Sequence, residues 1–334
     1  MRTPIGVALS ALVALAAMQA FASRETAPLA ATKPIVQRMQ INSLAQSKTA
    51  MLAGGELGQL SYSRDAGKTW TPAAIDQNRQ ASINQISFSA DGLTGMAVGH
   101  EGWILRSTDG GLAWKEVNFQ QRNGEPLMSI ARMPSGEWIA VGAFGRAIKS
   151  NADGSNWQAL ELPPSVEDKH LNRITGSADG RQWMIVGERG LVLISNDSGA
   201  SWRDLPPFYN GSFYNVASLV NGGWLVYGMR GNAFRSSDGG NSWTKAQIPA
   251  PISFFAHSQD AQGHITLAGQ GGMLALSTDE GQSFTLRRAG MRATLTDLLI
   301  QGKDQTWIAS STGLHPLPPA PAAAVKVANA GASQ

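Results

Sequence analysis

The sequence contains no cysteine and is poor in charged side chains, which make up 15% of its 334 residues. Without cysteine there are no disulfides, so in an oxidising compartment the fold must rest on packing and hydrogen bonds. The 27 Lys and Arg residues nearly balance the 24 Asp and Glu residues, and both are scattered along the chain. Because no dense basic run is present, we expect no DNA or RNA partner. The five histidines show no metal-ligand spacing, so we predict neither a metal nor a cofactor.

Long apolar runs are scarce, and the one at Ile5 to Ala17 is short for a bilayer span of about 20 residues. Arg2 precedes this run, and Ala20-Phe21-Ala22 follows it as an A-x-A cleavage site. This order predicts a secretory signal peptide over residues 1–22, the alternative being an uncleaved anchor. No cysteine follows the site, so a lipoprotein is not expected. We therefore expect a soluble periplasmic or secreted protein, with a disordered Pro/Ala-rich tail at 318–334.

Glycine is abundant, with 37 residues, and much of it recurs at a fixed period. Six copies of a Ser-x-Asp-x-Gly-x-x-Trp motif, the Asp box, end at aromatic residues spaced 41 to 45 residues apart. The boxes are Ser63–Trp70, Ser107–Trp114, Ser150–Trp157, Ser195–Trp202, Ser236–Trp243 and Ser277–Phe284. In the third box Ala152 takes the Asp place. A G-x-x-G motif precedes each box, at Gly55/Gly58, Gly99/Gly102, Gly142/Gly145, Gly187/Gly190, Gly228/Gly231 and Gly269/Gly272.

Short apolar segments between these motifs predict four strands, A to D, in every repeat, which is the pattern of a propeller blade. A seventh unit begins at Leu295 and has no Asp box, while Pro34 to Met39 stands where its missing outer strand would lie. We therefore predict an all-β, seven-bladed propeller of four-stranded antiparallel blades over residues 33–317. Its ring would be closed by the N-terminal strand, which removes exposed sheet edges.

The Asp boxes have a local structural interpretation. Their Asp is expected to accept hydrogen bonds from backbone N–H groups two residues on, and their Gly to allow a positive φ in the hairpin. Nine of the ten Trp residues occupy two repeat positions, the end of the box or the start of strand B, and only Trp103 does not. We interpret them as core residues and not as sugar-stacking platforms.

The Asp boxes resemble those of the bacterial neuraminidase-repeat superfamily. The box and G-x-x-G spacing, the seven units and the signal peptide are most similar to the photosystem II stability/assembly factor family. The resemblance covers about residues 33 to 315. It implies a non-catalytic binding protein that assists assembly or stability of an envelope or membrane protein complex, associated with the membrane through that client. We expect it to act as a monomer.

Propeller geometry places the G-x-x-G turns and the D–A connections on one face, and the A–B turns and Asp boxes on the other. We place partner binding on the first face, hereafter the G-x-x-G face, because variable loops on a rigid frame favour binding. Arginine recognises carboxylates, and Phe208 and Tyr209 offer apolar contact. The predicted site comprises Arg146, Arg173, Arg189, Arg230, His100, Glu101, Glu188, Phe208 and Tyr209. The alternative is that these are solvated turn residues.

The other functional class is a sialidase-like or other glycoside hydrolase, since Asp boxes occur in such enzymes. An ordinary glycosidase needs two facing carboxylates about 5 to 10 Å apart. Glu101 and Glu188 are candidates, but nothing in the sequence places them at that distance, and the R-I-P motif that opens sialidase domains is absent. We therefore predict a protein that is not an enzyme.

Overall fold

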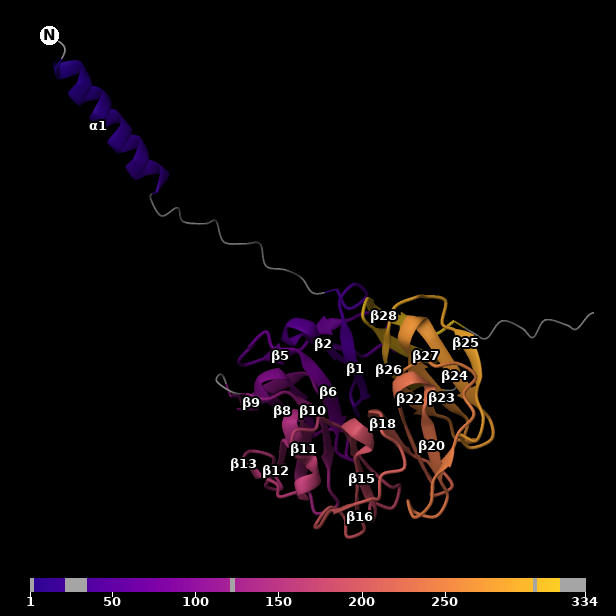
Figure 1. The fold of residues 1–334 in the computed structure, drawn as a ribbon. Helices are drawn as coiled ribbons and strands as arrows, with labels where there is room; N and C mark the ends of the chain where they lie inside the picture. The colour runs from indigo at the N-terminus through magenta and orange to yellow at the C-terminus, as the bar shows by residue number, and fades with distance from the viewer. Residues whose placement is uncertain (1–2, 22–34, 121–123, 303–304, 319–334) are drawn as a thin grey trace, which may run out of the picture. The chain divides into compact units, whose positions relative to one another are not determined.

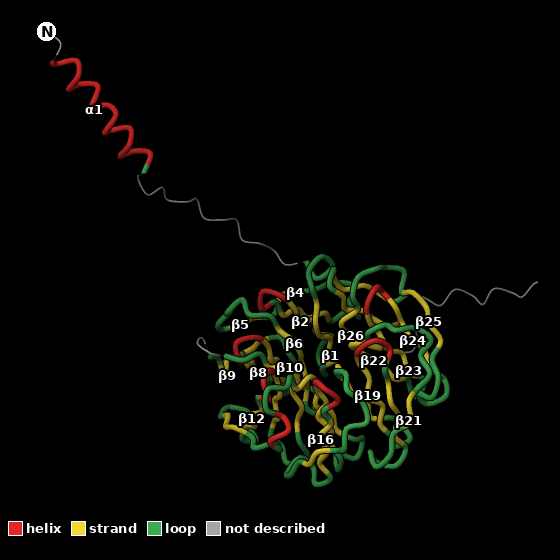
Figure 2. The backbone as a smooth tube through the Cα atoms, in the orientation of Figure 1, coloured by secondary structure: helices red, strands yellow, loops and turns green. Residues whose placement is uncertain are grey.

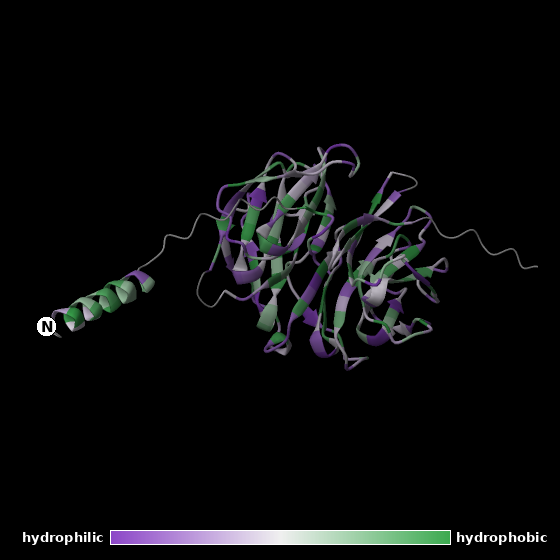
Figure 3. Ribbon diagram, turned by 90° about the horizontal axis from the view of Figure 1, so that it is seen from above, coloured by the Kyte–Doolittle hydropathy of each residue, from purple (hydrophilic) through white to green (hydrophobic). Residues whose placement is uncertain are grey.

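The computed structural model describes residues 3–21, 35–120, 124–302 and 305–318, in two units, Met1–Lys33 and Pro34–Gln334. The first unit contains helix α1 (Thr3–Ala20), in which Figure 3 shows mostly hydrophobic residues with a few hydrophilic ones. No helix within the described ranges combines the length and hydropathy that crossing a membrane requires. The predicted cleavage after Ala22 and residues 319–334 of the predicted tail lie outside the described residues.

The second unit is a ring of seven antiparallel sheets, each ordered from an inner to an outer strand (Figure 1). Blade 1 contains β1 (Ile41–Gln46), β2 (Met51–Gly55), β3 (Leu60–Ser63) and β4 (Thr71–Pro72). Blade 2 contains β6 (Ile83–Phe88), β7 (Gly95–Gly99), β8 (Ile104–Ser107) and β9 (Ala113–Asn118), with β5 (Ala74–Ile75) added parallel to β9. Blade 3 contains β10 (Leu127–Arg132), β11 (Trp138–Gly142), β12 (Ala147–Ser150) and β13 (Trp157–Ala159).

The same pattern continues through the second half of the ring. Blade 4 contains β14 (Leu171–Gly176), β15 (Trp183–Gly187), β16 (Val192–Ser195) and β17 (Arg203–Asp204). Blade 5 contains β18 (Phe213–Ser218), β19 (Trp224–Gly228), β20 (Ala233–Ser236) and β21 (Thr244–Lys245). Blade 6 contains β22 (Phe254–Gln259), β23 (Ile265–Gly269), β24 (Met273–Ser277) and β25 (Thr285–Arg288). Blade 7 contains β26 (Leu295–Gln301), β27 (Gln305–Ser310) and β28 (Gly313–Pro316). The predicted seven-bladed fold is confirmed.

The core lies between neighbouring blades. Strand B of most blades is buried at every residue, because adjacent sheets cover both of its faces. Between blades 2 and 3, for example, Met96 and Val98 pack with Ile130 and Trp138. Six of the ten Trp residues are buried, and the four at the ends of boxes 1, 3, 4 and 5 are half-buried. The Trp residues therefore serve the packing between blades, as predicted.

The N-terminal segment lies where it was predicted, beside β28, but it does not form a paired strand. Residues 36–39 form turns and bends, Val36 is buried, and its carbonyl accepts one backbone hydrogen bond from the N–H of Leu314, at 2.9 Å. Alternate residues of a strand direct their N–H groups to the same side. The next N–H on this edge would belong to Pro316, which has none, so the edge cannot support a longer ladder.

Side chains close the ring between blades 7 and 1. Asp297 Oδ2 accepts the N–H of Leu44 at 2.7 Å, and Thr296 Oγ1 donates to the carbonyl of Ile41. The next junction uses the same device, because Ser43 Oγ accepts the N–H of Ile86 at 3.0 Å. The closing junction is therefore one more copy of a repeated contact between inner strands.

The Asp boxes stabilise their own turns and also join neighbouring blades. In blade 5, Asp238 Oδ1 accepts the N–H groups of Asn241 and Ser242 at 3.0 and 2.9 Å. These donors lie three and four residues after Asp238, so the predicted spacing of two was wrong. The longer loop closes through the Ser236 hydroxyl, which donates to Asp238 Oδ1 at 2.7 Å. Gly240 has φ +89°, and a Cβ there would crowd Met184 of blade 4.

The G-x-x-G motifs form tight turns between strands B and C, which Figure 2 shows in red. They are η1 (Glu56–Gly58), η2 (His100–Gly102), η3 (Ala143–Gly145), η5 (Glu188–Gly190), η6 (Met229–Gly231) and η7 (Gln270–Gly272); η4 (Pro164–Val166) lies in a D–A connection. The second glycine always has a positive φ, between 62° and 73°. The first has no room for a Cβ, which at Gly55 would overlap the carbonyl oxygen of Gln40. The motif is therefore required by the backbone at both glycines.

Candidate functional site

The residue before the second glycine of each motif forms the tip of its turn, and its backbone is left-handed. These αL tips are Leu57, Glu101, Phe144, Arg189, Arg230 and Gly271, with φ between 52° and 65°. The five non-glycine tips are exposed. Their left-handed backbone costs an L-residue roughly 1 to 2 kcal/mol. The fold thus presents five side chains, of four different types, at equivalent, strained positions of one face.

The four predicted arginines are not one cluster. Arg189 and Arg230 are exposed αL tips, and neither forms an ion pair within the described ranges. Arg146 follows the tip of blade 3, is half-buried, and lies 3.7 Å from Glu125. Arg173 lies on the inner strand β14 and lines a pocket whose rim is formed by A–B turns. Its predicted place beside Arg189 and Arg230 was therefore wrong, because the middle of strand A faces the channel.

The predicted acidic and histidine residues have separate environments. His100 and Glu101 are exposed on η2. Glu188 is half-buried, and its Oε2 accepts the N–H of His170 at 3.0 Å, so it holds the D–A connection. Glu101 belongs to blade 2 and Glu188 to blade 4, with blade 3 between them. The two carboxylates therefore belong to blades that are not neighbours in the ring.

Phe208 and Tyr209 are half-buried and pack inside the propeller. The Phe208 ring stacks on Trp243 with 4.9 Å between ring centroids, and it also meets Phe234 at 5.2 Å. Tyr209 packs against Phe213 at 5.3 Å. These rings fasten the D–A connection to the blade, which leaves only part of their surface for a partner.

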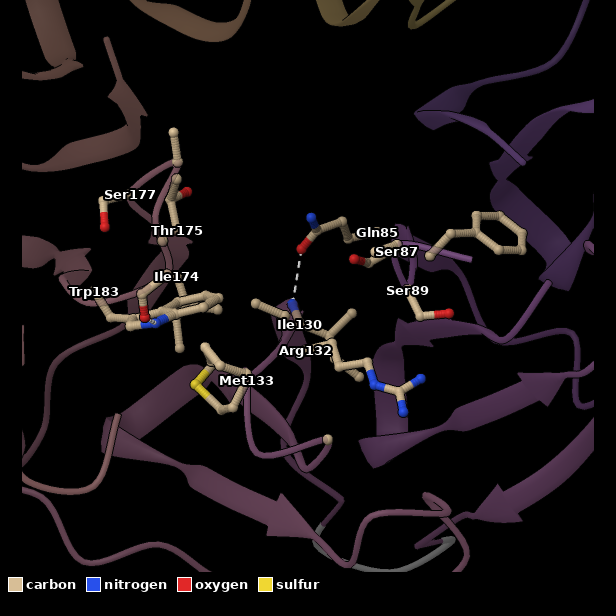
Figure 4. Close-up of a pocket in the computed structure, with 18 of the residues that line it drawn as sticks. Gln85, Ser87, Ser89, Ile130, Arg132, Met133, Ile174, Thr175, Ser177 and Trp183 are labelled. Atoms are coloured by element: carbon tan, nitrogen blue, oxygen red, sulfur yellow. Dashed lines mark hydrogen bonds between the residues drawn. The ribbon is translucent and has the colours of Figure 1, made fainter. Parts of the chain in front are cut away.

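The opposite face contains a pocket of about 730 Å³ at the mouth of the channel, between the inner strands of blades 2, 3 and 4 (Figure 4). Met133 and Trp183 form apolar walls, and Arg132 and Arg173 contribute positive charge. The guanidinium Nε of Arg173 is buried without a hydrogen-bond partner. Neither Arg132 nor this pocket was predicted from the sequence. The one signal for Arg132 is its place as the last residue of strand A in blade 3, next to a turn.

Buried titratable groups interact with Arg173. Burial raises the pKa of Asp297 to about 6, although the N–H of Leu44 and the charge of Arg173 oppose the shift. Burial lowers the pKa of His257 to about 3, and its Nδ1 lies 2.7 Å from the hydroxyl of Tyr227. His257 is therefore an internal hydrogen-bonding residue. No group of three potential metal ligands occurs among the described residues.

Comparison with known proteins shows that part of the chain is similar to a known family. The family model of the photosynthesis system II assembly factor YCF48 matches residues 37–161. The photosystem II assembly lipoprotein Ycf48 of Synechococcus sp. (strain CC9902) is 26% identical over 115 residues, which are 34% of each chain. The chain thus matches about a third of the length of this curated relative. The resemblance predicted from the repeats is confirmed.

Solved structures share the fold over most of the chain. YCF48 bound to D1 peptide has a TM-score of 0.66 and 19% identity, covering 87% of this chain and 97% of that chain. YCF48 from Cyanidioschyzon merolae has a TM-score of 0.67 and 17% identity, covering 84% and 96%. A streptogramin B lyase has a TM-score of 0.73 at 13% identity, covering 85% and 94%. Because the lyase has a higher TM-score than either YCF48 structure, the architecture alone does not decide the function.

Proposed function

We propose that this propeller is a non-catalytic assembly factor, which binds an extramembrane segment of a membrane protein through its G-x-x-G face. Arg189 and Arg230 carry the proposal, because they are exposed at strained tips and have no intramolecular ion pair among the described residues. A strained residue without a structural partner suggests a functional role. The similarity to YCF48, one of whose solved structures contains a D1 peptide, supports a peptide segment as the ligand.

The proposed site of action is the periplasm or the exterior, after cleavage of the signal peptide, with the protein acting as a monomer. The curated relative is named a lipoprotein. This chain has no cysteine to carry a lipid, so we propose that it reaches the membrane through its client. The proposed lack of catalysis is supported by the similarity to proteins that are named assembly factors.

The test is affinity purification of the tagged protein from detergent-solubilised envelope, followed by identification of the membrane proteins that co-purify. Arg189→Glu/Arg230→Glu should lose the client, because charge reversal repels acidic groups. Glu101 occupies the equivalent tip of blade 2, so glutamate fits this turn. The matched control is Arg181→Glu/Arg203→Glu, which reverses two exposed charges around a pocket on the Asp-box face. Equal client recovery with both variants would refute the proposed face.

A further inference from the structure

The αL tips include two large apolar residues that the assembly of the propeller does not explain. Leu57 and Phe144 are 58% and 59% exposed, and they occupy equivalent positions of blades 1 and 3. The other exposed large apolar residues of the described propeller are Ile35, Val220 and Ile300, none of which has a positive φ. Leu57 and Phe144 therefore combine two unfavourable features, an apolar surface in water and a left-handed backbone.

Blade 6 shows that this side chain is dispensable for the turn. Its tip is Gly271, which adopts φ +65° and still forms the same turn. The N–H of Met273 closes this turn by donating to the carbonyl of Gln270. Glycine occupies the αL region without the steric cost of a Cβ. The guanidinium of Arg288 donates to the carbonyl of Gly271 at 3.1 Å, so this tip still carries an arginine from a neighbouring strand.

The local contacts of Phe144 hold its ring at the surface. Its N–H donates to Nδ1 of His170 at 3.2 Å, and its ring meets the edge of the His170 ring with 4.9 Å between centroids. Hydrogen bonding and ring contact thus fix the turn and limit the positions of the ring. A side chain positioned in this way loses little conformational entropy on binding, which favours its use as an anchor.

Resting on the proposed function, we infer that four of the αL tips bind the client on the G-x-x-G face. Arg189 and Arg230 contact its acidic groups, and Leu57 and Phe144 receive its apolar side chains. The client segment then carries both acidic and apolar side chains, because the tips of blades 4 and 5 are Arg189 and Arg230. Charge complementarity selects the acidic groups, and desolvation of the apolar tips adds affinity. Strain at these tips is retained because it serves binding and not folding.

This inference predicts opposite effects on stability and on binding for one substitution. Leu57→Gly/Phe144→Gly relieves the left-handed strain, so the melting temperature should be unchanged or higher. The matched control is Ser198→Gly, which relieves the same strain at φ +60° in an Asp-box turn on the opposite face. Leu57→Asn/Phe144→Asn is a second variant, since asparagine tolerates this conformation and is not apolar.

Binding is measured by fluorescence anisotropy with three labelled 12-residue peptides of alternating Glu and Leu, Glu and Ser, or Lys and Leu. The wild-type chain should bind the Glu-Leu peptide more tightly than the other two. Both tip variants should lose at least about 10-fold in affinity for the Glu-Leu peptide and little for the Glu-Ser peptide, while Ser198→Gly keeps wild-type affinity.

Three results would overturn the inference: equal wild-type affinity for the Glu-Leu and Glu-Ser peptides, unchanged Glu-Leu binding by the tip variants, or a lower melting temperature of the glycine variant. Failure of the proposed function has a different signature. In that case no membrane protein co-purifies from the envelope, whatever the peptides show.

Discussion

Asp297 provides a direct test of how the ring is closed. It accepts N–H groups from Leu44 at 2.7 Å and Leu298 at 2.9 Å, and burial raises its pKa to about 6. A pKa above the ordinary value of 3.8 means that the folded state holds the proton more tightly than the unfolded state. Its contribution to stability is therefore largest below pH 4 and is lost as the pH rises through 6.

The magnitude follows from the shift. One pH unit inside this window is worth about 1.4 kcal/mol for a single group, so ionisation of Asp297 lowers the free energy of unfolding by about 2 kcal/mol between pH 4.5 and 7.5. The charges that act on this carboxyl are Arg173 from β14 and, once ionised, Tyr227 from β19. His257 acts in the opposite direction in the same window, because its pKa is lowered to about 3. The wild-type profile alone thus mixes two opposed effects.

The substitution Asp297→Asn separates the effect of Asp297 from that of His257, because it removes the charge of Asp297 and keeps one acceptor oxygen. We expect the variant to lose stability at pH 4.5, where one N–H is left without an acceptor, and to recover about 2 kcal/mol relative to wild type at pH 7.5. Urea unfolding of both proteins at the two pH values measures this difference. A stability difference between variant and wild type that does not change with pH would refute a raised pKa at Asp297.

The remaining predictions concern the repeats and the processing. Gly269→Ala should cost about 2 kcal/mol or more, because its Cβ would overlap the carbonyl of Ser253, whereas Gly271→Ala meets no neighbouring atom and should cost only about 1 kcal/mol of αL strain in denaturant titrations. Asp238→Ala should lower the melting temperature at pH 5 but much less at pH 2. Hydrogen bonds from Ser242 lower the Asp238 pKa to about 2, and its contribution is lost as the pH falls to that value. Intact mass of the exported protein should correspond to a chain that begins at Ser23, and an uncut chain would contradict the signal peptide.

The architecture could be predicted because its signals are local and repeated. Gly55 and Gly58 are needed by the backbone wherever strand B turns into strand C, so the same two residues recur in six blades. The closure was harder to predict, because it depends on single side chains such as Asp297 and on the missing N–H of Pro316. The contact at Asp297 recurs between other blades through different side chains, such as Ser43, so no sequence motif marks it. A strand beside β28 was therefore the simpler expectation.

The candidate site could be predicted only in outline. The G-x-x-G turns were recognised as binding loops, and Arg189 and Arg230 do stand at their tips. The side-chain direction of Arg173 depends on its place within strand A, which the sequence does not resolve to a single residue. Phe208 was expected at the surface because it lies in a loop, but the neighbouring Trp243 provides a stacking partner that only the folded blade brings close. The tips Leu57 and Phe144 were passed over because an apolar turn residue has no chemical motif.

The most direct test of the working face uses the client segment identified by co-purification. Its equilibrium dissociation constant is measured for the wild-type chain and for the two double arginine variants. The account predicts that Arg189→Glu/Arg230→Glu weakens binding at least about 10-fold, and that the wild-type affinity falls as salt is raised. Arg181→Glu/Arg203→Glu should bind as the wild type does. Loss of binding by the Asp-box-face variant, with the G-x-x-G-face variant unaffected, would contradict the account.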